Sequence, residues 1–140
     1  MSESANCIFC KIVRGEIPSI KIHEDAQTLS FMDVRPASPG HTLVISKAHT
    51  PNLLEIAEAD LLAVTVVVQR VAQAIQKALA PDGMRVSQFN GAAAGQTVFH
   101  YHVHIIPTQE GQRIGAHGRD QADAQQLESL AAQIRAALGS

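Results

Sequence analysis

The chain has 140 residues, 46% of them hydrophobic and 17% charged, which suits one compact domain with its own core. Its formal net charge of −2, with no basic run, excludes an extended nucleic-acid surface and favours a small molecule as any phosphate-bearing partner. The most apolar stretch, residues 61–68, is far shorter than the roughly 18 to 20 residues that span a bilayer, and the first residues lack the features of a secretory signal, so we expect a cytoplasmic protein with reduced cysteines and no membrane partner.

Three short segments in the first third of the chain predict antiparallel strands. They are β-branched or alternate between polar and apolar residues, and they cover 20–24, 27–34 and 41–46. The sequence Arg-Pro-Ala-Ser-Pro-Gly at 35–40 is a strong turn signal between the second and the third segment. We therefore expect these strands to pair as neighbours in one sheet.

A long helix follows, because apolar residues recur from position 61 to 79 at a 3-4-3-4-4 spacing. It should begin near Asp60, end before Pro81 and Gly83, and cover the sheet with its apolar stripe.

The rest of the chain predicts two more strands and a final helix. The strands cover 84–90 and 98–107, with a loop of small residues at 91–96 between them. From Asp120 onward, a helix is indicated by the spacing of Leu127, Leu130, Ile134 and Leu138.

The strand at 98–107 contains the most informative pattern, since His100, His102 and His104 alternate with apolar residues in His-Tyr-His-Val-His-Ile-Ile-Pro. Alternate residues of a strand share one face at a spacing of about 6.6 Å, so the three rings would face the same ligand. Placing three titratable rings on one face costs desolvation without an apolar gain, and a function explains the pattern better than a structural role. Two interpretations stay open, a nucleophile for phosphorus and a metal centre of all three histidines.

Cys7 and Cys10 form a Cys-x-x-Cys pair, which is typical of half a zinc site, of a redox pair or of two buried thiols. His49 and His100 could complete a tetrahedral zinc site, with about 2.3 Å to sulfur and 2.0 to 2.1 Å to nitrogen. Four protein ligands leave no open position, so this zinc would be structural and would tie the N-terminal segment to the histidine strand. His100 would then take no part in the chemistry.

The pattern His-φ-His-φ-His-φ-φ, with φ apolar or aromatic, resembles the signature of the histidine triad (HIT) nucleotide-binding proteins, in their bacterial type with a Cys-x-x-Cys zinc site. Other segments between residues 7 and 107 resemble this family in the same order, namely Cys-Ile-Phe-Cys-Lys-Ile-Val-Arg-Gly-Glu-Ile-Pro, Phe-Met-Asp-Val, Pro-Gly-His-Thr-Leu-Val-Ile-Ser-Lys-Ala-His and Asn-Gly-Ala-Ala-Ala-Gly-Gln-Thr-Val.

The resemblance implies the HIT-like fold, of class α+β, in which one long helix packs on an antiparallel sheet of about five strands and a short helix lies near the N-terminus. We expect the HIT domain to cover 1–108, and the extension at 109–140, with its helix, to belong to the same compact unit. The resemblance also implies a two-fold homodimer.

The resemblance makes His102 the nucleophile that attacks the α-phosphorus of a nucleotide and forms a covalent nucleotidyl-histidine, which water then hydrolyses. A neutral imidazole suits this step near pH 7, because the phosphoramidate that it forms is labile. Its other ring nitrogen must be held protonated by an acceptor, most simply a backbone carbonyl. His104 and His41 would also be catalytic, lying against the phosphate and either stabilising charge or protonating the leaving group.

A nucleotide pocket around the histidines is implied in the same way. Asp33 would hold the ribose hydroxyls, while backbone N–H groups and a hydroxyl of the small-residue loop would contact the phosphate. The nucleotide-binding residues are expected to be Asp33, Asn90, Gln96, Thr97, Val98 and His104, with Phe9, Ile12, Ile17 and Leu43 as candidates for the base pocket. His23 and His117 match no motif and are expected on the surface.

The leading functional hypothesis is a nucleotide hydrolase or nucleotidyl transferase of the purine nucleoside phosphoramidase type, acting on AMP-type compounds such as adenosine phosphoramidates or related adenylylated molecules. Dinucleoside polyphosphates are a second substrate class for the same chemistry. Two other classes remain: a metal-binding protein that uses all three triad histidines, and a nucleotide-binding scaffold with incidental hydrolysis.

Overall fold

A five-stranded antiparallel sheet is the frame of the computed structural model, which describes residues 5–115, 118 and 120–139. In chain order the elements are α2 (Ile8–Val13), β1 (Lys21–Glu24), β2 (Thr28–Met32), β3 (Thr42–Ser46), α3 (Glu58–Leu79), β4 (Gly83–Ser87), the 3-10 turn η1 (Ala92–Ala94), β5 (His102–Thr108) and α4 (Ala124–Leu138). The strands lie in the order β1-β2-β3-β5-β4, so β5 is an inner strand and β4 an edge strand. This confirms the predicted α+β architecture, including its three antiparallel neighbours β1, β2 and β3.

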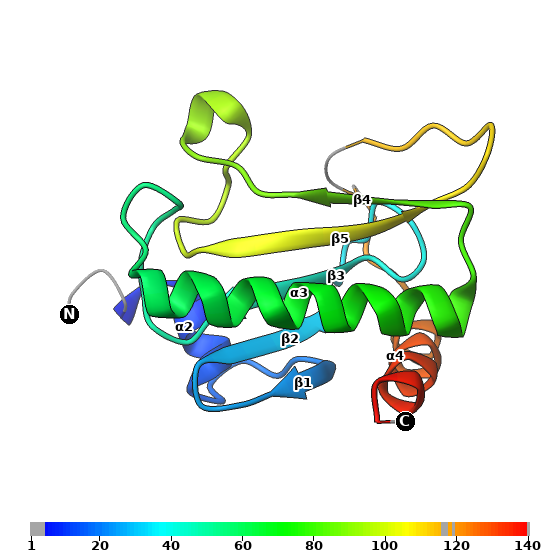
Figure 1. The fold of residues 1–140 in the computed structure, drawn as a ribbon, viewed down its shortest axis with the longest axis horizontal. Helices are drawn as coiled ribbons and strands as arrows, with labels where there is room; N and C mark the ends of the chain where they lie inside the picture. The colour runs from blue at the N-terminus through cyan, green and yellow to red at the C-terminus, as the bar shows by residue number, and fades with distance from the viewer. Residues whose placement is uncertain (1–4, 116–117, 119, 140) are drawn as a thin grey trace.

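The two faces of the sheet are covered by different helices. Figure 1 shows α3 running along the front of the sheet, with α4 beside its C-terminal end. Val44 and Ile105 point to this side and pack with Val71 of α3 and Ile134 of α4. On the opposite face, α2 contributes Phe9 and Ile12 to a smaller apolar cluster that includes Leu29, Phe31, Leu43 and Ile45.

The helix α3 begins at Glu58, slightly before the predicted start, and it ends at Leu79 as expected. Ala80 ends it by adopting a left-handed conformation with φ 47, directly before Pro81. The buried residues of this helix differ in part from the predicted apolar stripe, because the helix packs against both the sheet and α4. The buried residues are Val64, Val67, Val71, Ala74 and Ile75.

The helix α4 begins at Ala124, four residues later than predicted. The cause is local, since the side chain of Asp123 caps the helix by accepting a hydrogen bond from the Gln126 N–H at 3.1 Å. Within the part of the chain that the structure describes, no helix combines the length and the apolar character needed to cross a bilayer.

The strand that contains the histidines is shorter than predicted, and it includes only two of the three triad histidines. β5 begins at His102, while His100 and Tyr101 precede it in a bend. There the Tyr101 N–H donates to the carbonyl of Thr50 at 2.7 Å, which draws the backbone toward the loop after β3. The prediction that all three histidines share one strand face was therefore wrong for His100.

The other strands also stop short of the predicted ends nearest the histidines. Asp33 follows β2, His41 precedes β3 and Asn90 lies beyond β4, so each is on a loop at the sheet's margin. A tight turn brings the first two together, because the Asp33 N–H donates to the carbonyl of His41 at 3.0 Å. Gly40 in this turn has φ 94, and a Cβ there would lie 2.7 Å from Leu79 Cδ1, so the turn needs glycine.

Candidate active site and metal-ligand cluster

His102 and His104 of β5 point to the face of the sheet that α2 covers. His102 pairs across the sheet with Ile45, and His104 with Leu43, both members of the apolar cluster on that face. The two rings are buried, and their centroids lie 5.0 Å apart. They therefore form a pair of neighbouring imidazoles at the edge of an apolar cluster.

One hydrogen bond fixes the tautomer of His102. Its Nδ1 lies 2.6 Å from the backbone carbonyl oxygen of His100. Because a carbonyl only accepts, Nδ1 carries the proton and Nε2 of a neutral ring keeps its lone pair. The sequence predicted an acceptor of this kind, and the structure identifies it as the carbonyl of His100.

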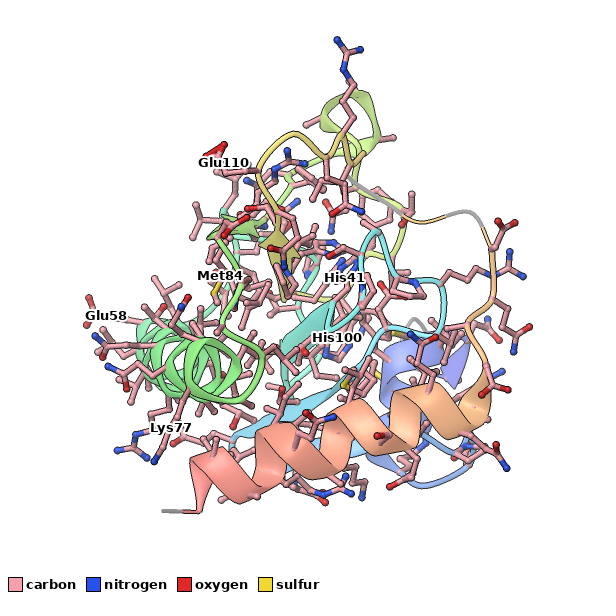
Figure 2. The ribbon with its side chains drawn as sticks, turned by 90° about the vertical axis from the view of Figure 1, so that its right-hand side faces the viewer. His41, Glu58, Lys77, Met84, His100 and Glu110 are labelled. Atoms are coloured by element: carbon pink, nitrogen blue, oxygen red, sulfur yellow. The ribbon has the colours of Figure 1, made fainter. Side chains whose placement is uncertain are left out.

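His100 lies in a cluster with Cys7, Cys10 and His49, whose ligand atoms all lie within 4.8 Å of one another. Figure 2 shows His100 near the middle of the molecule, beside the sheet. Its Nε2 lies 2.6 Å from the Ser46 carbonyl oxygen and donates to it, which leaves a lone pair on Nδ1. This Nδ1 lies 3.4 Å from Cys7 Sγ and 3.5 Å from Cys10 Sγ, and His49 Nδ1 lies 3.2 Å from Cys10 Sγ.

These distances fit a tetrahedral zinc ion. Bonds of about 2.3 Å to sulfur and 2.0 to 2.1 Å to nitrogen place sulfur and nitrogen ligands about 3.6 Å apart around zinc. Burial first, and then the nearby rings of His49 and His102, together lower the pKa of His100 to about 4, so the ring is neutral and able to ligate near pH 7. Burial, together with a hydrogen bond that the Cys10 thiol donates to Cys7, raises the pKa of Cys10 to about 11, so a metal would have to displace its proton.

His41, which Figure 2 labels, lies beside the ring of His104. Its Nε2 is 3.0 Å from His104 Nδ1 and 3.5 Å from Asp33 Oδ2, and its ring is fully buried. Asp33 is half-buried, and its Oδ1 accepts a hydrogen bond from the Arg35 N–H at 2.8 Å. The structure thus brings the predicted catalytic histidines and the predicted ribose-binding aspartate together.

The loop between β4 and β5 is held by Gln96, whose side chain is buried. Its oxygen accepts a hydrogen bond from the Gly91 N–H at 2.8 Å, and its nitrogen donates to the carbonyls of Pro51 at 2.6 Å and Val98 at 3.0 Å. Sequence reasoning assigned Gln96 to the nucleotide. In the structure its side chain connects two protein loops.

The other predicted nucleotide contacts in this loop differ in their surroundings. The Asn90 side chain exchanges two hydrogen bonds with Gln88 and accepts one from the Leu53 N–H at 2.9 Å. Thr97 is exposed, and Val98 is half-buried against the apolar cluster that contains Phe9.

The candidate base-pocket residues Phe9, Ile12, Ile17 and Leu43 all belong to that cluster. Phe9 meets the rings of His102 and His100 edge-on, at centroid distances of 5.0 and 5.8 Å. Sequence reasoning missed Phe89, whose ring lies 5.7 Å from that of His104. Its position directly before Asn90 was the only available signal.

Of the two unassigned histidines, His23 is partly exposed and lies 2.9 Å from Asp25. His117 lies outside the described residues.

A cavity of about 860 Å³ borders the metal-ligand cluster and the β4–β5 loop, and Cys7, His49, Thr97 and Val98 are among its lining residues. Neither His102 nor His104 is among the residues that line this cavity.

Comparison with known proteins identifies the family. The HIT domain sequence model matches residues 14–111. A crystal structure of a HIT-like protein involved in cell-cycle regulation from Bartonella henselae superposes with a TM-score of 0.88 at 45% identity, covering 94% of this chain and 96% of that one. A Zn-bound histidine triad family protein from Mycobacterium smegmatis superposes with a TM-score of 0.85 at 37% identity, covering 97% and 95%.

The adenylylsulfatase HINT3 of Arabidopsis thaliana is 45% identical over 105 residues, which are 75% of this chain and 53% of that protein. The two superpositions agree with the arrangement of the sheet and the helices described above. This chain belongs to the HIT domain family.

Proposed function

We propose that this protein is a nucleotide hydrolase or nucleotidyl transferase of the purine nucleoside phosphoramidase type. Its substrates would be adenosine phosphoramidates or related adenylylated compounds, and His102 would be the nucleophile. The observation that supports this most strongly is the 2.6 Å contact from His102 Nδ1 to the His100 carbonyl, because it leaves Nε2 as a nucleophilic nitrogen. The similarity to HINT3, which is named as an adenylylsulfatase, supports adenylyl chemistry.

The reaction would proceed in two displacements at the α-phosphorus. First, the lone pair of His102 Nε2 forms a bond to phosphorus while the bond from phosphorus to the leaving group breaks and its electrons depart with that group. Water then attacks the same phosphorus, and the electrons of the phosphorus–nitrogen bond return to Nε2. The net reaction consumes one water and yields a nucleoside monophosphate and the protonated leaving group.

The neighbouring residues would orient the nucleotide during both steps. Asp33 would accept hydrogen bonds from the ribose hydroxyls, and the loop with Asn90, Gln96, Thr97 and Val98 would approach the phosphate with N–H groups and the Thr97 hydroxyl. A dinucleoside polyphosphate would use the same chemistry with a bulkier leaving group.

We also propose a structural zinc ion on Cys7, Cys10, His49 and His100. Two sulfurs and two imidazole nitrogens are a donor set that zinc prefers, and all four atoms lie within 4.8 Å of one another. With four protein ligands, the metal would hold α2 against the segment that follows β3 and the segment that precedes β5, and it would take no part in bond breaking. The Zn-bound relative from M. smegmatis supports this assignment.

A homodimer is the third part of the proposal. β4 is an edge strand whose Val86 is 52% exposed, and α3 exposes Leu62 at 59% and Val66 at 47%. Large exposed apolar side chains beside an unpaired strand edge are typical of an interface between protein chains. A second copy related by a two-fold axis could pair with β4 and cover these residues.

We keep a cytoplasmic location as a further prediction.

The proposed function is tested by mass spectrometry of protein quenched during turnover of adenosine 5′-phosphoramidate, adenosine 5′-phosphosulfate and diadenosine tetraphosphate in parallel. We expect an adenylyl adduct on the peptide that contains His102, and no adduct or turnover with His102→Ala, which should still bind AMP. His23→Gln is the control, since His23 is remote from the triad. Unchanged turnover in His102→Ala would refute the nucleophile, and tight AMP binding without turnover of any compound would favour the scaffold.

A further inference from the structure

The loop between β4 and β5 contains an asparagine followed by a glycine, at Asn90–Gly91. In such a pair the backbone nitrogen of the glycine can attack the side-chain carbonyl carbon of the asparagine, because glycine has no side chain that hinders the approach. A bond forms from the Gly91 nitrogen to this carbon, the bond from the carbon to Nδ2 breaks, and ammonia leaves with the proton of the Gly91 N–H. Water then opens the cyclic succinimide to aspartate or isoaspartate. The loop is therefore prone to spontaneous deamidation.

The backbone of the loop requires glycine at position 91. Gly91 has φ 95 and ψ 153, a combination that residues with a Cβ hardly adopt. A larger residue, which would slow the attack on Asn90, is thus excluded by the conformation of the chain. Any protection of Asn90 has to come from the hydrogen bonds around the pair.

The side-chain carbonyl of Asn90 is polarised by two donors. Its Oδ1 accepts hydrogen bonds from the Leu53 N–H at 2.9 Å and from Gln88 Nε2 at 2.8 Å. Two donors on a carbonyl oxygen stabilise the negative charge that develops there when a nucleophile adds to the carbon. These contacts favour the attack, so the reaction depends on whether the Gly91 nitrogen is available.

The Gly91 nitrogen is held by Gln96. Its N–H donates to Gln96 Oε1 at 2.8 Å, and Gln96 is only 4% exposed. The Gln96 amide is itself fixed, because its Nε2 donates to the carbonyls of Pro51 and Val98. The Gly91 nitrogen must lose its proton and turn toward Asn90 before it can attack, so this buried hydrogen bond has to break first.

We propose that Gln96 suppresses the deamidation of Asn90 by binding the N–H of Gly91. The rate of conversion is then set by local opening of the loop, in which this contact is lost. The reaction needs only Asn90, Gly91 and water, so it is independent of the proposed nucleotide chemistry. Its product carries a new negative charge at position 90 and, as isoaspartate, one additional carbon in the backbone of the loop.

The first test follows the full-length parent protein at mildly alkaline pH, in the native state and in urea. Deamidation is measured as a mass gain of about 1 Da on the peptide that contains Asn90, and isoaspartate by enzymatic methylation. We expect the native protein to convert at least about tenfold more slowly than the unfolded protein. Asn52 is the internal control, because the side chain of Leu53 hinders the attack in both states. Equal rates at Asn90 in the two states would overturn the proposal.

The second test compares two glutamines of the same loop. Gln96→Ala frees the Gly91 N–H, whereas Gln88→Ala loosens the loop at Asn90 and leaves the contact between Gly91 and Gln96 in place. We expect native Gln96→Ala to deamidate at least about tenfold faster than the parent, and Gln88→Ala to stay within roughly threefold of it. Circular dichroism must show the parent's fold in both variants. Equal acceleration in both, or none in Gln96→Ala, would show that Gln96 does not protect Asn90.

Hydrogen exchange in the parent protein keeps the proposal testable if Gln96→Ala does not fold. We expect the Gly91 N–H to exchange at least about tenfold more slowly than in an unstructured peptide with the sequence of this loop. Exchange as fast as in the peptide would mean that Gln96 does not hold this N–H, and the proposal would fail.

Discussion

Gln96 shows how one buried amide can organise the active-site loop. Its nitrogen donates to the carbonyls of Pro51 and Val98, and its oxygen accepts from the Gly91 N–H. In Gln96→Glu both donated bonds are lost and a carboxylate faces two carbonyls in a site that is 4% exposed. We expect the free energy of unfolding to fall by about 1–3 kcal/mol in urea denaturation. Gln73→Glu, on the exposed side of α3, is the matched control, and an equal effect at both positions would contradict this role.

Residue types at the site could be predicted from the sequence, but the hydrogen bonds between them could not. The sequence identified His102 and required an acceptor for its second nitrogen. That acceptor is a backbone carbonyl of His100, whose position depends on the bend before β5. The Ala37 N–H that donates to His41 Nδ1 is likewise a backbone group with no signature in residue type.

At the scale of single elements, the stability of the short helix α2 should depend on the metal-ligand cluster of Cys7, Cys10, His49 and His100. A helix of six residues is too short to be stable by itself, and Cys7 at its N-cap and Cys10 within it are both proposed zinc ligands. We expect near one zinc per chain by elemental analysis, lost in Cys7→Ser together with about 5 °C or more of thermal stability. Ile8→Ala, on the same helix at a side chain that is 47% exposed, should change little. Metal-free protein with unchanged melting temperature would refute the structural zinc.

The helix α4 allows a test of the prediction that residues 1–108 and 109–140 form one compact unit. Ile134 is fully buried and packs in the same cluster as residues of α3 and the sheet. Ile134→Ala should therefore lower the free energy of unfolding by about 2–4 kcal/mol in a single urea transition. Gln133→Ala, at the exposed neighbouring position, is the control. Two separate transitions, or no loss of stability, would show that the extension folds independently.

Elements were predicted best where periodicity was long and worst near the histidines. The spacing in α3 located that helix to within two residues at its start, because burial against the sheet repeats with the helical period. Asp33, His41 and His100 lie outside the strands and make hydrogen bonds to residues distant in the sequence. Strand propensity continues through these positions, so the sequence alone could not show where pairing stops.

At the scale of the whole molecule, the sheet order explains why the site and the proposed interface do not compete. β5 is an inner strand between β3 and β4, so its histidines are held by neighbours on both sides. The outer edge of β4 pairs with no other strand in the described part of the chain. The open edge, with Val86 and the exposed residues Leu62 and Val66 of α3, therefore remains available for a second copy.

Light scattering of the full-length protein coupled to size exclusion tests this interface. We expect a mass of about twice the 15.0 kDa of one chain for the parent, and a mass near one chain for Val86→Glu combined with Leu62→Glu, because two charges on each copy would lose water on pairing. Gln133→Glu, an exposed position on α4, should leave the mass unchanged. Circular dichroism of the double variant must show the parent's fold, so that loss of the dimer is distinguished from unfolding. A parent protein with the mass of one chain at micromolar concentration would refute the proposed homodimer.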